Sequence, residues 1–114
     1  MPHRQVIRDI QAGSLKPVYL LHGEEPYFID EIAKALENNV VEDSMRDFNQ
    51  TVVYGRDTNV DQVLEAARRF PMMAERQLVL MREAQGWPAW RRKDDMAKLE
   101  AYAEAPVAST VLVF

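Results

Sequence analysis

Short apolar runs alternate along this chain with longer segments in which apolar residues recur at helical spacing. The short runs are rich in β-branched and aromatic residues, a composition that favours strands. They predict four strands, at residues 17–22, 50–54, 77–81 and 110–114. The first, third and fourth runs are almost continuously apolar, which is typical of strands buried on both faces of a parallel sheet.

The longer segments predict helices at about residues 6–12, 26–38, 60–69 and 91–103. Three of them carry apolar stripes, formed by Phe28, Ile29, Ile32 and Leu36, by Val60, Val63, Leu64 and Ala67, and by Met96, Leu99 and Tyr102. Each stripe is expected to pack on the sheet. Thr58 and Asp61 have capping-box-like spacing at the start of the third helix. Together the elements predict an α/β fold, a three-layer arrangement in which crossover helices cover a parallel sheet.

The composition fits one globular domain over residues 1–114. With 47% hydrophobic and 28% charged residues, the chain can form a core and lacks the polar character of disordered proteins. Its net charge of -4 gives the domain as a whole no electrostatic footprint for nucleic acid. Any contact with DNA is therefore expected to be local or indirect.

Cysteine is absent from the sequence. This excludes disulfides and thiol chemistry and fits a reducing compartment, so a cytoplasmic location is predicted. There is no apolar run near the length that crosses a bilayer, and the first residues lack the apolar core of a secretion signal. Neither a membrane span nor secretion is expected.

The sequence ends at Phe114, inside the signal for the fourth strand. An apolar strand left at a terminus would invite pairing with other molecules along its edge. We therefore expect the chain to be a piece of a longer protein, truncated after its fourth strand.

The turn after the first strand lies where nucleotide-binding folds hold phosphate. If Gly23 takes the first glycine of the motif G-x-x-x-x-G-K-[ST], then Phe28 replaces the second glycine, Ile29 the lysine and Asp30 the hydroxyl residue. The groups that would hold phosphate and Mg²⁺ are missing. We interpret the turn as a degenerate phosphate loop that binds no cofactor. The alternative, a P-loop ATPase domain of a replication or repair factor, predicts saturable ATP binding.

Other candidates for chemistry are weak. Glu24 and Glu25 lie beside a helix start, where they stabilise the helix dipole and repel phosphate. They have no accompanying nucleophile, oxyanion donor or metal-ligand cluster. His3 and His22 are far apart and lack partners at metal-ligand spacing. No catalytic residue and no metal site is predicted.

Trp87 and Trp90 stand beside the basic run 91–93, an arrangement found in nucleic-acid-binding patches. Asp94 and Asp95 follow at once and cancel much of the positive field. A solvated helix start is the favoured interpretation.

Phe70, Pro71, Met72 and Met73 form a bulky apolar cluster in the connector between a helix and a strand. Pro71 ends the helix and favours an extended conformation at Phe70. Connectors usually lie at the surface. Two interpretations stay open: a satellite core cluster, or an exposed hydrophobic wedge for a partner protein.

Four segments of the chain together carry a family resemblance. They are Y-L-L-H-G-E-E-P at 19–26, F-N at 48–49, F-P-M-M-A-E-R-Q-L-V-L-M-R-E-A at 70–84, and T-V-L-V-F at 110–114. In this order and spacing they resemble the N-terminal part of the bacterial DNA polymerase III delta subunit family, a component of the clamp loader. The resemblance covers nearly the whole chain from Lys16 onward.

The resemblance implies a fold of AAA+ or P-loop-NTPase type whose nucleotide site has degenerated. In the family this domain is followed by a helical lid and a helical collar, and both would be absent here. The implied function is DNA replication, as a non-catalytic part of the polymerase holoenzyme that binds the beta sliding clamp and helps to open the ring. Other loader subunits are further implied partners, mainly through the missing regions, while DNA contact would be indirect or weak.

The resemblance also implies which residues bind the clamp. In the family, the loop before the third strand inserts two large apolar side chains into a pocket on the clamp. By position these are Met72 and Met73, with Phe70 as a flanking contact. The family often has leucine and phenylalanine where this chain has two methionines, and methionine adapts readily to irregular pockets.

Overall fold

The computed structural model describes residues 2–21, 26–71 and 74–114. Four helices of more than one turn and four strands make up most of the described chain, joined by shorter helical turns. The helices are α1 (Pro2–Gln11), α2 (Pro26–Asn39), the short α3 (Arg46–Asn49), α4 (Val60–Arg68) and α5 (Lys93–Glu104); the strands are β1 (Val18–Tyr19), β2 (Gln50–Tyr54), β3 (Gln77–Arg82) and β4 (Thr110–Val113).

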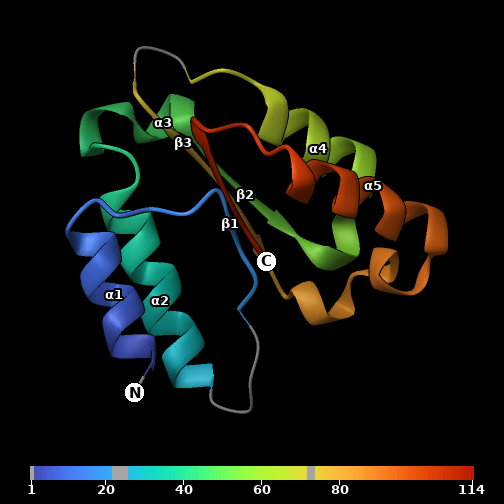
Figure 1. Ribbon diagram of the computed structural model, residues 1–114, viewed down its shortest axis with the longest axis horizontal. Helices are drawn as coiled ribbons and strands as arrows, with labels where there is room; N and C mark the ends of the chain where they lie inside the picture. Colours follow the sequence, from blue (N-terminus) through green and yellow to red (C-terminus); the bar gives the residue numbers. More distant parts are fainter. Residues whose placement is uncertain (1, 22–25, 72–73) are drawn as a thin grey trace.

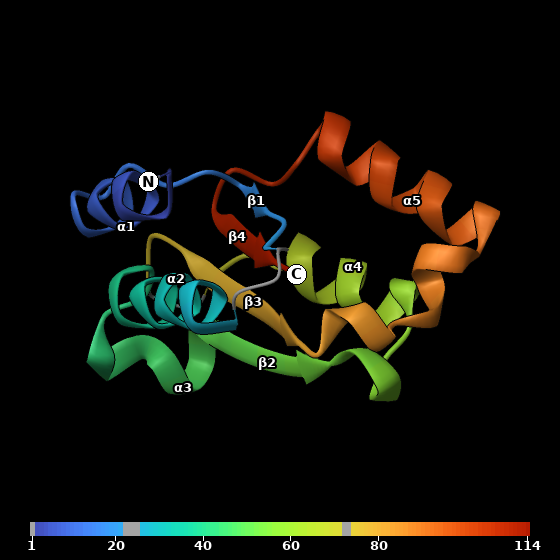
Figure 2. The same cartoon turned by 90° about the horizontal axis from the view of Figure 1, so that it is seen from below.

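All strands in the described residues run parallel, in the order β1-β4-β3-β2 (Figure 1). Helices α1 and α2 lie on one side of the sheet and α4 and α5 on the other, as Figure 2 shows from below. The predicted three-layer α/β fold is thereby confirmed, and the strand order, which the sequence does not determine, is added to it.

Two cores lie on the two faces of the sheet, and β3 and β4 contribute to both by simple alternation. Leu78, Leu80, Val111 and Val113 pack under α1 and α2. Val79, Met81, Leu112 and Phe114 pack under α4 and α5. The prediction that these two strands are buried on both faces is confirmed.

The first strand differs from its prediction. The expected run 17–22 is a regular strand only at Val18–Tyr19, and Leu20 is 59% exposed. Among the described strands β1 stands at the end of the order and has β4 as its one neighbour, so less of it is held in the sheet. Backbone hydrogen bonds still join the two from the Pro17 carbonyl, which accepts from Leu112, to the Leu21 amide, which donates to Phe114.

The helix predictions hold to within a few residues at most ends, with one correction at the start of α4. The capping box uses Asn59 and Gln62, not Thr58 and Asp61. The Asn59 side chain accepts from the Gln62 amide at 2.9 Å, and Gln62 Oε1 accepts from the Asn59 amide at 3.3 Å. Because the helix begins at Val60, the N-cap falls one residue later than the predicted position.

Candidate partner-docking site

The connector between α4 and β3 presents Phe70 to solvent. Its side chain is 82% exposed, although phenylalanine is among the residues most often buried. Of the two open interpretations, Phe70 therefore does not support the satellite core cluster. Met72 and Met73, the other predicted contacts, lie outside the described residues.

Two buried polar side chains contact the end of α4, where this connector begins. Gln77 begins β3 and Thr110 begins β4, and the two are register partners across the sheet. The Gln77 amide nitrogen Nε2 lies 3.1 Å from the Ala66 carbonyl oxygen, 2.5 Å from that of Arg69 and 2.9 Å from Thr110 Oγ1. The Thr110 hydroxyl in turn donates to the Ala67 carbonyl at 2.6 Å. These bonds join the last turn of α4 to the sheet immediately before Phe70.

Sequence reasoning missed Gln77 and Thr110 as functional candidates. A signal was available, because each is a polar residue at the first position of a strand that is otherwise apolar. Buried polar groups in proteins are hydrogen-bonded, so such residues indicate a specific partner. The partners themselves, helix carbonyls on another element, could not be known without the fold.

The degenerate phosphate loop is predicted to follow β1, at the carboxyl ends of the strands. Gly23 lies outside the described residues, so the motif can be followed only at its second half. Phe28 and Ile29 are half-buried on the first turn of α2, and Asp30 is exposed. The Phe28 ring meets the Tyr27 ring edge to face at 5.6 Å.

A cavity of about 720 Å³ opens at the carboxyl ends of the strands, and Ile29 and Asp30 form part of its wall. Much of the remaining lining is apolar, including Leu80, Val113 and Phe114. Arg82 also lines the cavity, but its guanidinium forms an ion pair with the Glu37 carboxylate. The residues that replace the lysine and hydroxyl group of a phosphate loop thus offer a phosphate only an apolar side chain and a carboxylate.

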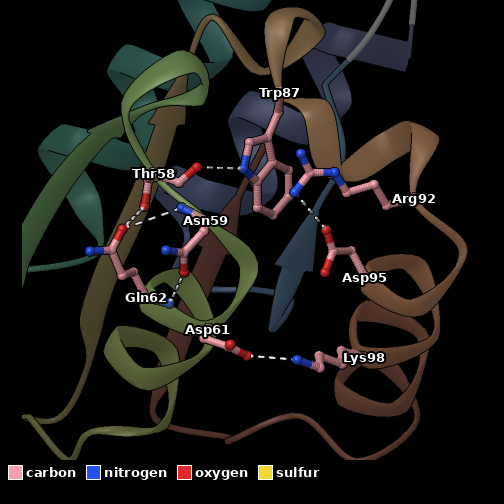
Figure 3. A network of polar contacts seen from close by, with 8 residues as sticks. All are labelled: Thr58, Asn59, Asp61, Gln62, Trp87, Arg92, Asp95 and Lys98. Atoms are coloured by element: carbon pink, nitrogen blue, oxygen red, sulfur yellow. Dashed lines mark hydrogen bonds and ion pairs between the residues drawn. The ribbon is translucent and has the colours of Figure 1, made fainter.

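Of the two tryptophans beside the basic run 91–93, Trp87 points toward the Thr58 carbonyl (Figure 3). Trp87 is only 2% exposed, and its indole nitrogen donates to the Thr58 carbonyl at 3.1 Å. It stacks on Phe114, with 5.6 Å between ring centroids, and the half-buried Trp90 meets both rings edge-on. Trp87 is therefore a core residue with no face free to stack on a nucleic acid base.

The charged residues beside the tryptophans behave as a solvated helix start. Arg91, Arg92, Lys93 and Asp94 are exposed, and Arg92 lies 3.9 Å from the Asp95 carboxylate. Further along α5, Lys98 binds Asp61 of α4 at 2.9 Å, and this contact raises the pKa of Lys98 (Figure 3). The favoured interpretation of this segment is confirmed.

The parts of the chain that the structure describes offer few other groups for chemistry. Those parts hold no cluster of three or more histidine, cysteine or acidic side chains arranged to bind a metal ion. None of the described helices combines the length and apolar character needed to cross a bilayer. Tyr27 has a raised pKa because it hydrogen-bonds Glu31, but both residues are on the surface of α2.

The fold and the exposed Phe70 together define a parallel α/β domain with an apolar side chain in solvent before β3. Comparison with known proteins places that domain in a family. Residues 19–114 match the family model described as DNA polymerase III, delta subunit, so the chain belongs to the DNA polymerase III delta subunit family. The predicted family membership is confirmed.

Two relatives from Bacillus subtilis show how much of the family protein is present. DNA polymerase III subunit delta of strain 168 is 30% identical over 112 residues, which are 95% of this chain and 32% of the relative. The solved structure of the DNA clamp loader delta protein matches with a TM-score of 0.83 at 29% identity, over 97% of this chain and 34% of that chain. This chain therefore spans about a third of the length of these relatives and corresponds to the N-terminal domain of the subunit.

Proposed function

We propose that this domain is the part of a clamp-loader delta subunit that grips the ring-shaped sliding clamp during DNA replication. Phe70, Met72 and Met73 form the contact. The observation that carries the proposal is the exposed Phe70 side chain at the connector before β3. The two methionines follow it within three residues, so the sequence itself places further large apolar side chains at the same connector.

The contact has enough apolar surface to matter energetically. Burying a large apolar side chain contributes about 1.5 to 3 kcal/mol. Ordering the connector and losing free motion on association oppose this gain. Two or three such side chains in one pocket still form an energetic hot spot, since a few buried anchors typically dominate an interface.

Opening a ring requires more than tight binding. A ligand that binds the closed and the open clamp equally well shifts no equilibrium between them. In the proposed mechanism the apolar wedge therefore binds more tightly to a clamp whose subunit interface is distorted. ATP hydrolysis in neighbouring loader subunits then drives release.

The proposal assigns no catalytic step and no cofactor to this chain. The chain is proposed to be a non-catalytic component of the polymerase holoenzyme that works in the cytoplasm. In this proposal the degenerate nucleotide site belongs to an AAA+-like domain, and the lid, the collar and most contacts to other loader subunits belong to the rest of the protein. Contact with DNA is indirect or weak, in line with the net charge of -4.

The test is a binding titration with the sliding clamp of the same organism. The double variant Met72→Ser with Met73→Ser should lose clamp binding, and Phe70→Ser should weaken it by a smaller factor. Both should keep the far-ultraviolet circular dichroism and the unfolding midpoint of the parent chain.

Leu20→Ser is the matched control for these variants. Leu20 is a large apolar residue that is also exposed, but it follows the carboxyl end of β1, whereas Phe70 precedes the amino end of β3. It should bind the clamp with the affinity of the parent chain. Clamp binding that survives in the Met72, Met73 double variant would refute the assignment of these residues.

A further inference from the structure

Gln77 and Thr110 are buried polar side chains at the starts of β3 and β4, with 6% and 0% of their surfaces exposed. We propose that they are positioning residues for the docking connector, holding the end of α4 so that Phe70 is presented to the clamp in a fixed place. This inference rests on the proposed clamp-binding function. It concerns how the contact is presented and adds no contact of its own.

The end of α4 explains why such residues are needed. The last four carbonyl groups of a helix have no partner within the helix. Many helices end on a glycine in the left-handed conformation, whose turn lets backbone amides return to those carbonyls. Here the chain leaves α4 through Arg69 with φ -70° and ψ 153°, an extended conformation, and the Arg69 amide returns only to Ala66, at 3.3 Å.

Side chains from the sheet supply the missing donors. The Gln77 amide reaches the Ala66 and Arg69 carbonyls, and the Thr110 hydroxyl reaches the Ala67 carbonyl. The same nitrogen lies 2.9 Å from Thr110 Oγ1; because it has two hydrogens for three acceptors, one N–H is shared between two of them, and the Thr110 hydroxyl extends the network to the helix. Bonds arranged in series in a buried place reinforce one another.

The network fixes the backbone at the residue that precedes the exposed side chain. Arg69, whose carbonyl accepts at 2.5 Å, is bonded covalently to Phe70. The Gln77 backbone amide also donates to the Ser109 carbonyl at 2.8 Å, which ties the far end of the connector to the chain entering β4. Both ends of the segment between Arg69 and Gln77 are therefore held by the same pair of strand starts.

A connector held in this way binds a partner at lower entropic cost, because fewer conformations are lost on docking. The apparent affinity scales with the fraction of molecules in the competent conformation. If loss of the network reduced that fraction to about a tenth, the Kd for the clamp would rise about tenfold with every contact residue unchanged.

The first test measures the connector itself, without the clamp. The chain has no cysteine, so Glu75→Cys gives a single site for a nitroxide spin label on the exposed connector. Combining it with Gln77→Met, which keeps the side chain's length but removes the donors, should sharpen the spin-label spectrum. Thr110→Val, which replaces the hydroxyl by a methyl group, is a milder second variant that removes the bond to Ala67, the acceptor for Gln77 and the hydroxyl's hydrogen bond with Tyr102.

Two controls separate positioning from general loss of stability. Val63→Ala removes apolar volume from the same helix without touching the network, and it should leave the Glu75 label unchanged at temperatures where the protein is folded. A label at exposed Glu100 on α5 should respond to none of the variants. A spectrum at position 75 that Gln77→Met and Thr110→Val both leave unchanged would overturn the proposal.

The second test is the clamp titration with the unlabelled variants. Gln77→Met should weaken binding about tenfold and Val63→Ala should not. If the parent chain does not bind the clamp, the proposed function fails, and the label spectra still decide whether the network anchors the connector. If the parent chain binds and the Met72, Met73 double variant does not, an unchanged affinity in Gln77→Met refutes the positioning role alone.

Discussion

The two ends of the parallel strands are packed differently. At the carboxyl end of the strands, aromatic side chains pack against one another beside the cavity, and Trp87 is buried against Phe114. At the amino end, the Phe70 side chain is exposed to solvent, and the polar network of Gln77 and Thr110 lies at the end of α4. Open parallel sheets usually bind ligands at the carboxyl ends of their strands. In this domain the proposed contact is at the amino ends, so its location depends on surface chemistry and not on the fold alone.

The largest expected effect comes from removing the aromatic packing between Trp87 and Phe114. Trp87→Ala should lower the free energy of unfolding by about 3 to 5 kcal/mol, because it empties a large buried volume and removes the stack on Phe114. Urea denaturation measures this directly. Trp90→Ala, at a half-buried position, should cost less. A loss below about 1 kcal/mol in Trp87→Ala would show that this aromatic packing is not close.

A smaller effect is expected at Gly55, directly after β2. A Cβ atom there would lie 2.5 Å from the Glu83 carbonyl oxygen and 3.3 Å from the Trp87 Cβ. Gly55→Ala should therefore destabilise the fold by about 1 to 3 kcal/mol, the range for overpacking. Gly86→Ala is the matched control, since a Cβ at that position meets nothing within 4 Å. Equal stability of the two variants would contradict the close packing proposed for this end of the strands.

A modest effect of pH is expected from Tyr102, whose hydroxyl lies near the chain entering β4. Burial raises the pKa of Tyr102 above its ordinary value of 10.0. Above pH 10 the unfolded chain loses this proton while the folded chain retains it, so stability falls as the pH rises. Tyr102→Phe should show a shallower fall between neutral and alkaline pH in thermal unfolding. An identical slope in both proteins would show that ionisation of the Tyr102 hydroxyl does not lower the stability of the folded domain.

The smallest effect on stability is expected at Phe70. Phe70→Ser removes an exposed side chain and should change the free energy of unfolding by less than about 0.5 kcal/mol. The same variant should weaken clamp binding while leaving the free energy of unfolding almost unchanged. Trp87→Ala, in contrast, should lower the free energy of unfolding strongly. A stability loss above about 1 kcal/mol would mean that Phe70 packs on its own domain.

The fold was largely predictable because its strands and helices differ in period. The runs around Val79 and Leu112 are continuous in apolar residues, so burial on both faces followed directly from the sequence. The length of β1 was not predictable in the same way. Its residues are as apolar as those of the central strands, and only the structure shows that it has a single neighbour among the described strands.

The site was predictable only in part. Composition made Phe70 conspicuous but could not choose between a core position and an exposed one, because both use the same residue type. The tryptophans show the reverse case: their charged neighbours suggested a surface, while their partners Thr58 and Phe114 come from distant parts of the chain. Gln77 and Thr110 required the register between β3 and β4 before their shared role could be seen.

The strand order has a consequence for how this domain forms. Among the described strands β1 pairs with β4 alone, so its hydrogen-bonding partner emerges from the ribosome only after α2 to α5 have been synthesised. Translation proceeds at about 5 to 20 residues per second, which leaves β1 waiting for seconds. Contacts between distant residues also slow folding after release. During synthesis the short, two-residue β1 offers neighbouring nascent chains little edge on which to pair prematurely.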